Sequence, residues 1–503
     1  MINLKHLSKN SAVRKIAAVG LAAILMASMA ACSQNDSGAT DASTSADYLT
    51  KEDITVNETF ENSADGEHAI EVSGEEVTYS NIGVTKTGEA DGDEADFYGE
   101  NSAVFATEKG TLTISDSLIE TDGTHANAIF SYGEGTTVNV SNSVIETTGN
   151  CSGGLMTTGG AAMNAENLTI NTSGNSSAAI RSDRGGGTVT VTKGYYKTTG
   201  TGSPVIYSTA DITVNDAYME STASQGVVVE GKNSVTLNND TLVADNNTKN
   251  GDKSDYYQAV MIYQSMSGDA DVGTSSFTAN GGSITNKNGD IFFVNNTATE
   301  ISLTGVEITN EDGEGNFLRA EAAGWGNEGS NGGKINLNAS AQTIDGNIIV
   351  DDVSILNMYL KDKSSFTGAI NSDGQHGDVY VEIEDGSTWT LTDDSYISGL
   401  TVGEGTSIEL NGHKLYVDGK EYTEGSASEG TAFEITSGSE SSGSTSGMPG
   451  DGQTPPDGGQ GASNGGQGAP SGNPPEKPNG NGAPSGNPPS GNPPEKPDSD
   501  SGN

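Results

Sequence analysis

The sequence predicts an all-β fold, a single right-handed parallel β-helix with three short strands per rung. Three observations support this prediction. Pairs of apolar residues that flank one polar residue recur at separations of 26, 25, 26, 23 and 23 residues. β-Branched residues dominate these runs, which show no helical periodicity. Pro204 is the only proline before Pro449, which suits an uninterrupted hydrogen-bonded ladder. The apolar pairs are Leu112/Ile114, Val138/Val140, Met163/Ala165, Val189/Val191, Ile212/Val214 and Val235/Leu237.

A repeated unit of this length indicates a coil that stacks on itself. Alternation with a period of two buries the apolar pairs and sends the polar residue between them outward. One rung cannot bury its own inner face, so its neighbours must complete both the core and the hydrogen bonds. We therefore expect an outward polar ladder along the rod. Its members are Thr113, Asn139, Asn164, Thr190, Thr213 and Thr236.

The first 31 residues have the features of a bacterial export signal. Four basic residues precede an apolar stretch, residues 16–29, which is too short to span a membrane. The run "MAAC" that ends at Cys32 resembles the lipobox of bacterial lipoproteins. This resemblance implies that residues 1–31 are a lipoprotein signal peptide and that Cys32 is acylated. We therefore expect a lipid anchor at the extracellular face of the bacterial cell membrane.

The rest of the chain divides into three predicted parts. Residues 32–60 are expected to be a flexible tether, and residues 61–425 form the β-helix. From residue 426 the apolar periodicity stops, and this last segment contains 13 of the 14 prolines together with many glycines and serines. Such a composition buries too little apolar surface to offset the entropy of ordering. Residues 426–503 are therefore predicted to be a disordered tail.

The charge of the chain excludes several classes of partner. Acidic residues outnumber basic residues by 69 to 23. A chain this acidic repels DNA, RNA and anionic polysaccharides, so we expect no nucleic-acid partner. The membrane, contacted through the N-terminal lipid, and a glycan or a host or cell-surface protein remain as expected partners.

No catalytic residue is assigned from the sequence. Polysaccharide lyases and hydrolases need a basic residue beside carboxylates, or several carboxylates close together. Beyond residue 31 this chain has only three arginines, and its four histidines are scattered. We interpret the adjacent Asp183 and Arg184 as a surface ion pair. A cluster of three or more carboxylates with Arg or Lys on one strand face would favour an enzyme, whereas a long uniform face would favour a binding protein.

No cofactor or metal ligand is assigned either, although two acidic turns suggest calcium. The first turn fails the EF-hand pattern, because Asp96 stands where glycine is required and Ser102 where glutamate is required. We interpret both turns as solvated acidic loops. With Cys32 acylated, Cys151 has no disulfide partner and is expected to be an inert thiol in a turn. The acidic residues of the two turns are Asp91, Asp93, Glu94 and Asp96, and Asp269 and Asp271.

A surface binding stripe is predicted along the first strand of each unit. An aliphatic column is expected to point inward, and it comprises Val104, Ile129, Leu155, Ile180, Ile206 and Val229. Alternation then sends the following residue of each rung outward. Aromatic groups beside charged groups suit sugar stacking or a protein hot spot. This stripe comprises Phe105, Phe130, Met156, Arg181, Tyr207 and Glu230. A shifted register would instead bury the rings.

Three runs near the end of the β-helix resemble known proteins. The runs "STWTLT" (387–392), "LTV" (400–402) and "LNGHKL" (410–415) are similar to the ends of β-helical bacterial surface proteins and autotransporter passengers. The stretches "SDRGGGTVTV", "MIYQSMSGDADVG" and "WGNEGSNGG" resemble a group of secreted bacterial β-helix proteins, mostly of unassigned function. The resemblance covers roughly residues 70–420 and implies a pectin-lyase-like fold, without an activity.

These observations together indicate a lipid-anchored extracellular β-helix with an adhesin-like or carbohydrate-contacting surface. The alternative is a polysaccharide-active enzyme, a lyase or a hydrolase, on the same fold.

Overall fold

The computed structural model describes residues 48–249, 253–374, 377–384, 386–423, 425 and 430–436, without the side chains of Asp93 and Glu94. The predicted signal peptide and Cys32 lie outside the described residues, and so does most of the predicted tail. Within the described part of the chain, no helix has the length and apolar character that crossing a membrane requires.

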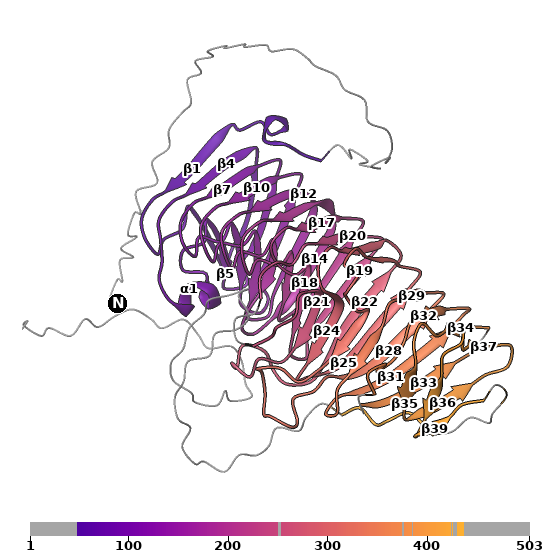
Figure 1. Cartoon of the computed structure of the whole chain (residues 1–503). Helices are drawn as coiled ribbons and strands as arrows, with labels where there is room; N and C mark the ends of the chain where they lie inside the picture. Colours follow the sequence, from indigo (N-terminus) through magenta and orange to yellow (C-terminus); the bar gives the residue numbers. More distant parts are fainter. Residues whose placement is uncertain are drawn as a thin grey trace, which may run out of the picture.

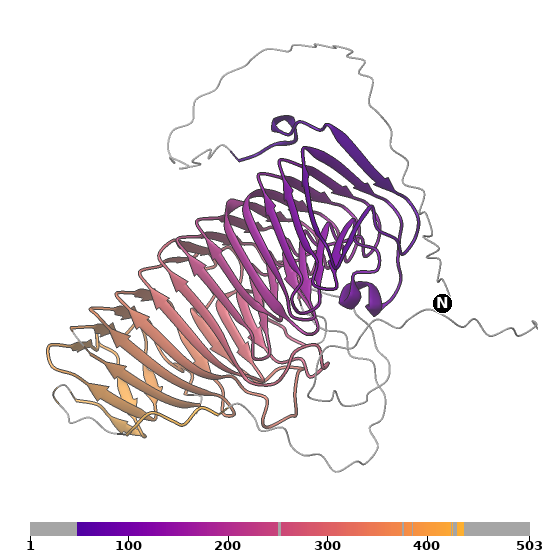
Figure 2. The ribbon, with the colours of Figure 1, turned by 180° about the vertical axis from the view of Figure 1, so that it is seen from behind.

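The described residues form a parallel β-helix, which confirms the predicted fold class. Figures 1 and 2 show the strands stacked in chain order along one rod, from β1 (Glu58–Asn62) at one end to β37 (Ser407–Glu409) at the other. Every strand pair is parallel except β38 with β39, a short hairpin at the C-terminal end. Its strands are Leu415–Val417 and Lys420–Glu421.

Three sheets run along the rod, and most rungs contribute a strand to each; the rung after β30 (Ile348–Val350) has only an isolated bridge from Ile348 to Ile370 in the first sheet. Sheet 1 has 11 strands. They are β2 (Ile70–Ser73), β5 (Val104–Thr107), β8 (Ile129–Tyr132), β11 (Leu155–Thr158), β13 (Ile180–Ser182), β15 (Ile206–Ser208), β18 (Val227–Glu230), β21 (Gln258–Tyr263), β24 (Asp290–Asn295), β27 (Leu318–Ala320) and β30 (Ile348–Val350). At its far end, β35 (Ser395–Ile397) pairs with β38.

Sheet 2 follows sheet 1 in each rung. Its strands are β3 (Glu76–Ser80), β6 (Thr111–Ser115), β9 (Thr137–Ser141), β12 (Ala161–Thr172), β14 (Gly187–Thr198), β16 (Asp211–Asn215), β19 (Ser234–Asn238), β22 (Thr274–Asn280), β25 (Ala298–Thr304), β28 (Lys334–Ser340), β31 (Ile355–Lys361), β33 (Asp378–Ile383) and β36 (Gly399–Val402). Because β12 and β14 continue around the bend, sheets 2 and 3 share one hydrogen-bonded network.

Sheet 3 completes each rung. It contains β1, β4 (Ile82–Lys86), β7 (Leu118–Thr121), β10 (Val144–Thr147), the second halves of β12 and β14, β17 (Tyr218–Ser221), β20 (Thr241–Ala244), β23 (Ser283–Asn286) and β26 (Glu307–Asn310). Beyond β26 the ladder is continued by β29 (Thr343–Asp345), β32 (Ser365–Thr367), β34 (Thr388–Thr390) and β37. Gln342 joins β26 to β29, because its side-chain amide exchanges two 2.8 Å hydrogen bonds with the backbone of Val306.

The predicted apolar columns stack in register inside the rod. Leu112 pairs with Val138, and the column continues through Met163 to Val235. These residues belong to one continuous core that runs from Ala69 to Val417. The polar residues between the apolar pairs remain at least partly exposed, as the outward ladder requires.

A column of glycines lies at one bend of four successive rungs. Gly123, Gly149, Gly174 and Gly200 occupy equivalent bends of successive rungs. A Cβ on Gly174 would lie 1.8 Å from the carbonyl oxygen of Gly149, which is far inside van der Waals contact. Only glycine therefore lets these bends stack at the spacing of the rungs.

The two ends of the body differ from the prediction. Residues 48–57 pack against sheet 3 and do not form part of a free tether, because Lys51 of the short 3₁₀-helix Lys51–Asp53 contacts Glu120 at 2.7 Å and also Glu146. The Tyr48 ring lies 5.0 Å from the ring of Tyr195. At the other end, the backbone of Phe433 exchanges two 2.9 Å hydrogen bonds with the side chain of Asn357 in β31.

Candidate functional site

The outer face of sheet 1 is covered by segments that leave the rungs and fold back over it. The helix α1 (Asp93–Tyr98) lies on this face, where Thr158 of β11 donates a 2.8 Å hydrogen bond to the carbonyl oxygen of Phe97. Farther along, the Trp325 ring packs 5.2 Å from the ring of Tyr263 in β21. The covering segments comprise residues 87–103, 253–257, 264–273 and 321–333.

This layer makes the predicted surface stripe wrong. Phe105, Phe130, Met156, Arg181, Tyr207 and Glu230 are all buried, with at most 5% of each residue exposed. Their aliphatic neighbours are buried too, so both faces of sheet 1 are internal. The inward half of the prediction is correct, but the outward side chains meet the covering layer instead of solvent. Phe105, Phe130 and Met156 form an apolar cluster of their own there.

The predicted register also fails at the last rung of the stripe. Ile206 pairs with Val227, and Tyr207 pairs with Val228. The predicted pairing with Val229 and Glu230 is therefore displaced by two residues. Because the displacement is even, Glu230 still points to the outer side of the strand.

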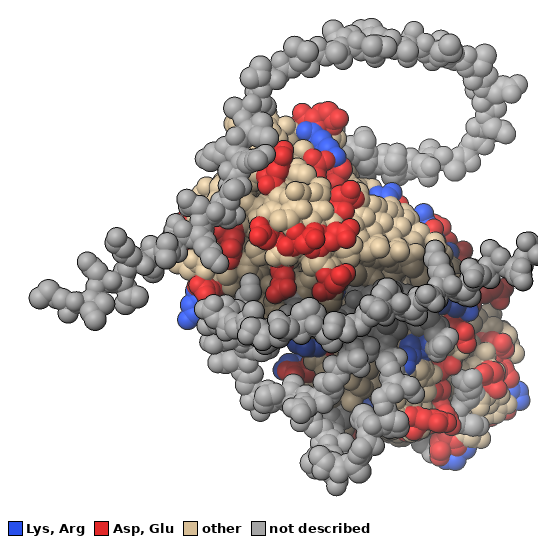
Figure 3. Space-filling view, turned by 90° about the vertical axis from the view of Figure 1, so that its left-hand side faces the viewer, with Lys and Arg blue, Asp and Glu red and all other residues tan. Residues whose placement is uncertain are grey.

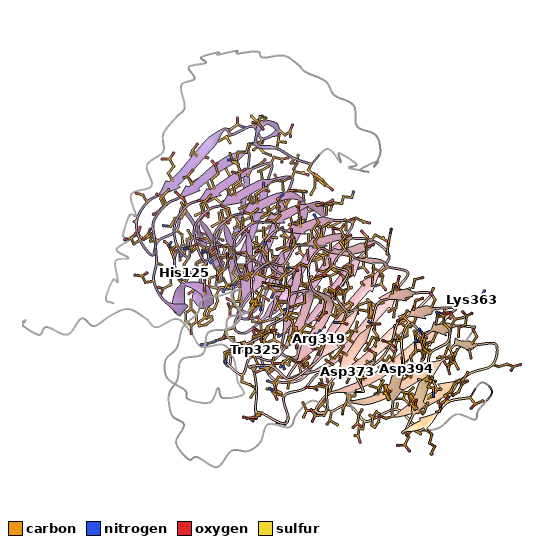
Figure 4. The ribbon with its side chains drawn as sticks, in the orientation of Figure 1. His125, Arg319, Trp325, Lys363, Asp373 and Asp394 are labelled. Atoms are coloured by element: carbon orange, nitrogen blue, oxygen red, sulfur yellow. The ribbon has the colours of Figure 1, made fainter. Side chains whose placement is uncertain are left out.

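Three chemically reactive side chains meet beneath α1. The carboxylate of Asp96, the imidazole of His125 and the thiol of Cys151 have donor atoms that all lie within 4.8 Å of one another. Nδ1 of His125 is 3.0 Å from Oδ1 of Asp96. All three residues are buried. Figure 4 shows His125 beside α1 on the covered side of the rod.

Arg181 extends this group along the sheet. Its Nη2 donates to Oδ2 of Asp96 at 3.3 Å and to Oδ2 of Asp183 at 2.9 Å. Its Nε and Nη1 have no hydrogen-bond partner among the described residues. Burial alone would favour the neutral form of Arg181, but the two carboxylates outweigh burial and raise its pKa. Arg181 is therefore a buried cation.

The two carboxylates differ because their surroundings differ. Burial would raise the pKa of Asp96, but Arg181 and His125 together hold that pKa below its usual range. Burial raises the pKa of Asp183 to about 7. The neighbouring carboxylates of Asp269 and Asp96 add to this increase, whereas the Arg181 guanidinium opposes it. Asp96 is thus the anionic member of the group at neutral pH, and Asp183 takes up a proton more readily than Asp96.

The predicted ion pair between Asp183 and Arg184 is wrong. Asp183 faces Arg181, and the Arg184 guanidinium reaches Asp269 with an Nη2 to Oδ1 distance of 2.6 Å. The same guanidinium lies 3.9 Å above the centre of the Phe97 ring. Arg184 therefore ties the 264–273 segment to α1 across the outer face of sheet 1.

A second polar group is centred on Glu230. The Tyr207 and Tyr263 hydroxyls donate to Glu230 at 2.5 Å and 2.8 Å, and Ser265 donates to its other oxygen. Burial raises the pKa of Glu230, although these three donors oppose the shift. Every carboxylate oxygen of Glu230 is thus satisfied from within the fold.

The two acidic turns do not assemble a calcium site among the described side chains. Asp96 is buried against Arg181, so the first turn is not the solvated loop predicted, while Asp91 is exposed. The predicted residues Asp93 and Glu94 lie outside the described side chains. In the second turn, Asp269 pairs with Arg184 and Asp271 pairs with Lys232 at 2.6 Å. Each of these carboxylates already faces a cation of the protein.

A third group lies near the middle of the rod. Arg319 donates to Asp290 at 2.7 Å and to Glu321 at 2.9 Å, and it stacks 3.8 Å above the Tyr256 ring. Figure 4 shows Arg319 and Trp325 on the same side as His125. The carboxylates and arginines on sheet 1 fall short of the sequence criterion for an enzyme, because each arginine pairs with at most two carboxylates, and the covering layer closes them off.

The outer face of sheet 2 differs from that of sheet 1, because it is a long and largely uniform polar surface. Asparagine amides form ladders from rung to rung, at 3.0 Å between Asn164 and Asn139 and at 2.9 Å between Asn238 and Asn215. Inward residues of the same strands are buried, so the outward polar rows define the surface. Figure 3 shows carboxylates scattered over the N-terminal end of the rod, with few basic side chains among them.

Toward the C-terminal end this face carries aromatic rings. The rings of Tyr359 and Tyr380 lie 6.3 Å apart, and the Tyr380 hydroxyl donates to Thr401 at 2.7 Å or to Glu382 at 2.9 Å. Nδ2 of Asn336 donates to Glu300 at 2.5 Å. We call this group the Tyr359 patch. Its members are Glu300, Asn336, Asn338, Tyr359, Tyr380, Glu382 and Thr401, from β25, β28, β31, β33 and β36.

No protein-family model, no curated protein and no solved structure matches this chain. The geometry of its own residues therefore carries the functional argument.

Sequence reasoning missed both groups for identifiable reasons. Asp96, His125 and Cys151 are far apart in the sequence. The repeat places His125 and Cys151 one above the other in consecutive rungs, so their separation of 26 residues was the signal that could have revealed this pair. The Tyr359 patch lies where longer turns obscure the repeat. Its signal was the alternation of asparagine and tyrosine with apolar residues over 334–361.

Proposed function

We propose that this chain is a lipid-anchored protein of the bacterial cell surface that binds a neutral glycan through the outer face of sheet 2. Acylated Cys32 would hold the rod at the extracellular face of the membrane. The Tyr359 patch would supply the main contact, and the asparagine and threonine ladders would extend it. The proposal rests chiefly on one observation, which is that the outward asparagine and threonine ladders of this face stay at least partly exposed, whereas both faces of sheet 1 are buried. The segment 430–436 lies on this face where Phe433 meets Asn357.

The chemistry of the patch suits an uncharged polyhydroxylated ligand. Amide groups of asparagine donate and accept, carboxylates accept, and the half-buried Tyr359 ring offers apolar area with a polar tip, beside Tyr380, which is only 4% exposed. Burial raises the pKa of both Tyr359 and Tyr380, so their hydroxyls stay protonated at neutral pH. The acidic chain would repel polyanions, so neutral sugars are favoured over uronic or sulfated ones.

A double variant tests this proposal. Tyr359→Ala with Tyr380→Ala should weaken binding on a glycan array at least about tenfold, because aromatic anchors dominate such contacts. The matched control is Tyr195→Ala with Tyr218→Ala, a stacked pair 5.4 Å apart on sheet 3 that Tyr48 already covers. Equal glycan binding by the two double variants would contradict the proposal. If the unmodified chain bound only proteins and no glycan, the ligand would be a protein and the glycan proposal would be wrong.

The anchor is tested separately. Cys32→Ala should release the protein from cells into the medium, because acyl chains on Cys32 are the proposed attachment. Fractionation of whole cells measures this release. A variant that stays in the detergent-soluble membrane fraction would contradict lipid anchoring without affecting the glycan proposal.

A second candidate function is a polysaccharide-active enzyme. The observation in its favour is the group of Arg181, Asp96 and Asp183 on the outer face of sheet 1, with the pKa of Asp183 raised to about 7. The covering layer argues against it, since substrate would need that layer to open. Release of reducing ends from a neutral polysaccharide by the purified chain, abolished by Asp183→Asn, would support the enzyme over the binding protein.

A further inference from the structure

Asp96, His125 and Cys151 offer one carboxylate, one imidazole and one thiol in a single buried position. Their donor atoms all lie within 4.8 Å of one another, and the Asp96 to His125 separation is 3.0 Å. These are the ligand types that Zn²⁺ takes in proteins. Tetrahedral zinc with bonds of about 2.0–2.2 Å separates neighbouring N and O ligands by about 3.3–3.6 Å. The Asp96 and His125 atoms therefore need to move apart by only about 0.3–0.6 Å to accommodate an ion between them.

The β-helix itself stacks two of the three side chains. The amide of His125 donates to the carbonyl of Asn150, and the amide of Cys151 donates to the carbonyl of Asn175, so the two residues occupy the same position in consecutive rungs. Both have left-handed backbone conformations, with φ of 56° and 54°. The next member of this column is Ser176, with the same φ of 56°. The helix α1 then brings the Asp96 carboxylate against the pair.

The surroundings of the three side chains also favour a cation. Two carboxylates, Asp96 and Asp183, share the single guanidinium of Arg181. A divalent cation bound with a Cys151 thiolate adds one net positive charge, which Asp183 balances in its ionised form, so that no buried charge is left uncompensated. Arg181 holds Oδ2 of Asp96, so this arginine orients the carboxylate and leaves Oδ1 facing His125.

We propose that Asp96, His125 and Cys151 bind one Zn²⁺ ion, with water as the fourth ligand, and that the ion fastens α1 to the rungs beneath it. Binding converts the thiol to a thiolate and releases its proton to solvent. The site is independent of glycan binding on sheet 2. Its role is to hold down the covering layer of sheet 1.

Metal titration of the purified full chain tests the proposal. After chelator treatment, the chain should bind one Zn²⁺ ion with a rise in thermal midpoint. Co²⁺ should produce a thiolate charge-transfer absorption. Cys151→Ser should remove that absorption and weaken Zn²⁺ binding at least about tenfold, and Asp96→Asn should weaken Zn²⁺ binding similarly. Because Ser176 already occupies this backbone position in the next rung, Cys151→Ser is expected to fold, and far-UV circular dichroism checks that it does.

The matched control is His413→Ala. It removes a member of the other Asp/His group, Asp393, Asp394 and His413, which lies in more solvent-accessible surroundings. This variant should bind Zn²⁺ like the unmodified chain. Absence of stoichiometric Zn²⁺ binding would overturn the proposal. Unchanged binding by Cys151→Ser, or loss of binding in His413→Ala, would overturn it too.

Discussion

Asp240 gives this β-helix a pH-dependent stability that one substitution should remove. It lies at the bend between β19 and β20, where its Oδ1 accepts the amide of Ala217 at 2.7 Å. Earlier rungs use serine for the same task, since Ser143 accepts the amide of Ser117 at 3.1 Å. Burial raises the pKa of Asp240 to about 7, although two backbone donors oppose the shift. The folded chain therefore keeps this proton to a higher pH than the unfolded chain.

The size of the effect follows from that pKa. The ordinary value is 3.8, so the stabilising contribution is complete below about pH 4 and is lost as the pH rises through about 7. Between pH 5 and pH 8 the free energy of unfolding should fall by about 2–3 kcal/mol because of this group alone. Asp240→Ser keeps an acceptor for the Ala217 amide and removes the titration. Its stability should therefore fall by about 2–3 kcal/mol less than that of the unmodified chain over this interval.

Urea denaturation followed by far-UV circular dichroism at pH 5, 6, 7 and 8 measures this difference. Comparing the two proteins cancels the contribution of the many other carboxylates. The control is Asp211→Ser, which removes an exposed carboxylate from a column that continues with Ser234 and Ser276. Parallel pH profiles for Asp240→Ser and the unmodified chain would refute the reasoning, as would an equal change in the control.

Two further predictions concern the stacking of the rungs and the end of the body. Gly174→Ala should lower the free energy of unfolding by about 1–3 kcal/mol, because the new Cβ would meet the carbonyl oxygen of Gly149 at 1.8 Å. Gly313→Ala, where a Cβ meets nothing within 4 Å, should be close to neutral, and equal urea midpoints would contradict the stacking argument. A chain that ends at residue 429 should be about 1–3 kcal/mol less stable than one that ends at 436, because Asn357 loses both hydrogen bonds to Phe433. Identical thermal unfolding of the two truncated chains would show that this contact contributes nothing.

The repeat predicted the interior of the rod well, because period and alternation are local properties. Leu112 and Val138 stack as expected, since strand alternation and rung spacing leave one way to bury a β-branched column. Whether an outward-pointing side chain is exposed or buried depends on segments that are distant in the sequence. Phe105 looks like a surface ring from its own strand, but the His68 ring stacks 4.6 Å from it and Phe130 packs beside it. No sequence pattern within β5 indicates that other residues pack over the Phe105 ring.

The candidate sites were less predictable for the same reason. The stripe failed because the 87–103 segment places a helix over sheet 1, and a short acidic helix gives little signal in sequence. Cys151 was interpreted as an inert turn residue, and the turn assignment is correct. Its neighbours His125 and Asp96 become visible only after the rungs are stacked and α1 is laid on them. Contacts between a rung and an inserted segment therefore set the limit of prediction from sequence.

Hydrogen–deuterium exchange on the full chain, with and without the neutral glycan that binds best on the array, tests the central claim most directly. That claim is that recognition takes place on sheet 2 while the covering layer keeps sheet 1 closed. Peptides from 334–361 and 378–383 should exchange more slowly when the glycan is bound, and peptides from 93–102 and 264–273 should not change. Protection or opening of those covering segments, with unchanged exchange over sheet 2, would contradict the account and place the functional site at the buried cluster around Arg181.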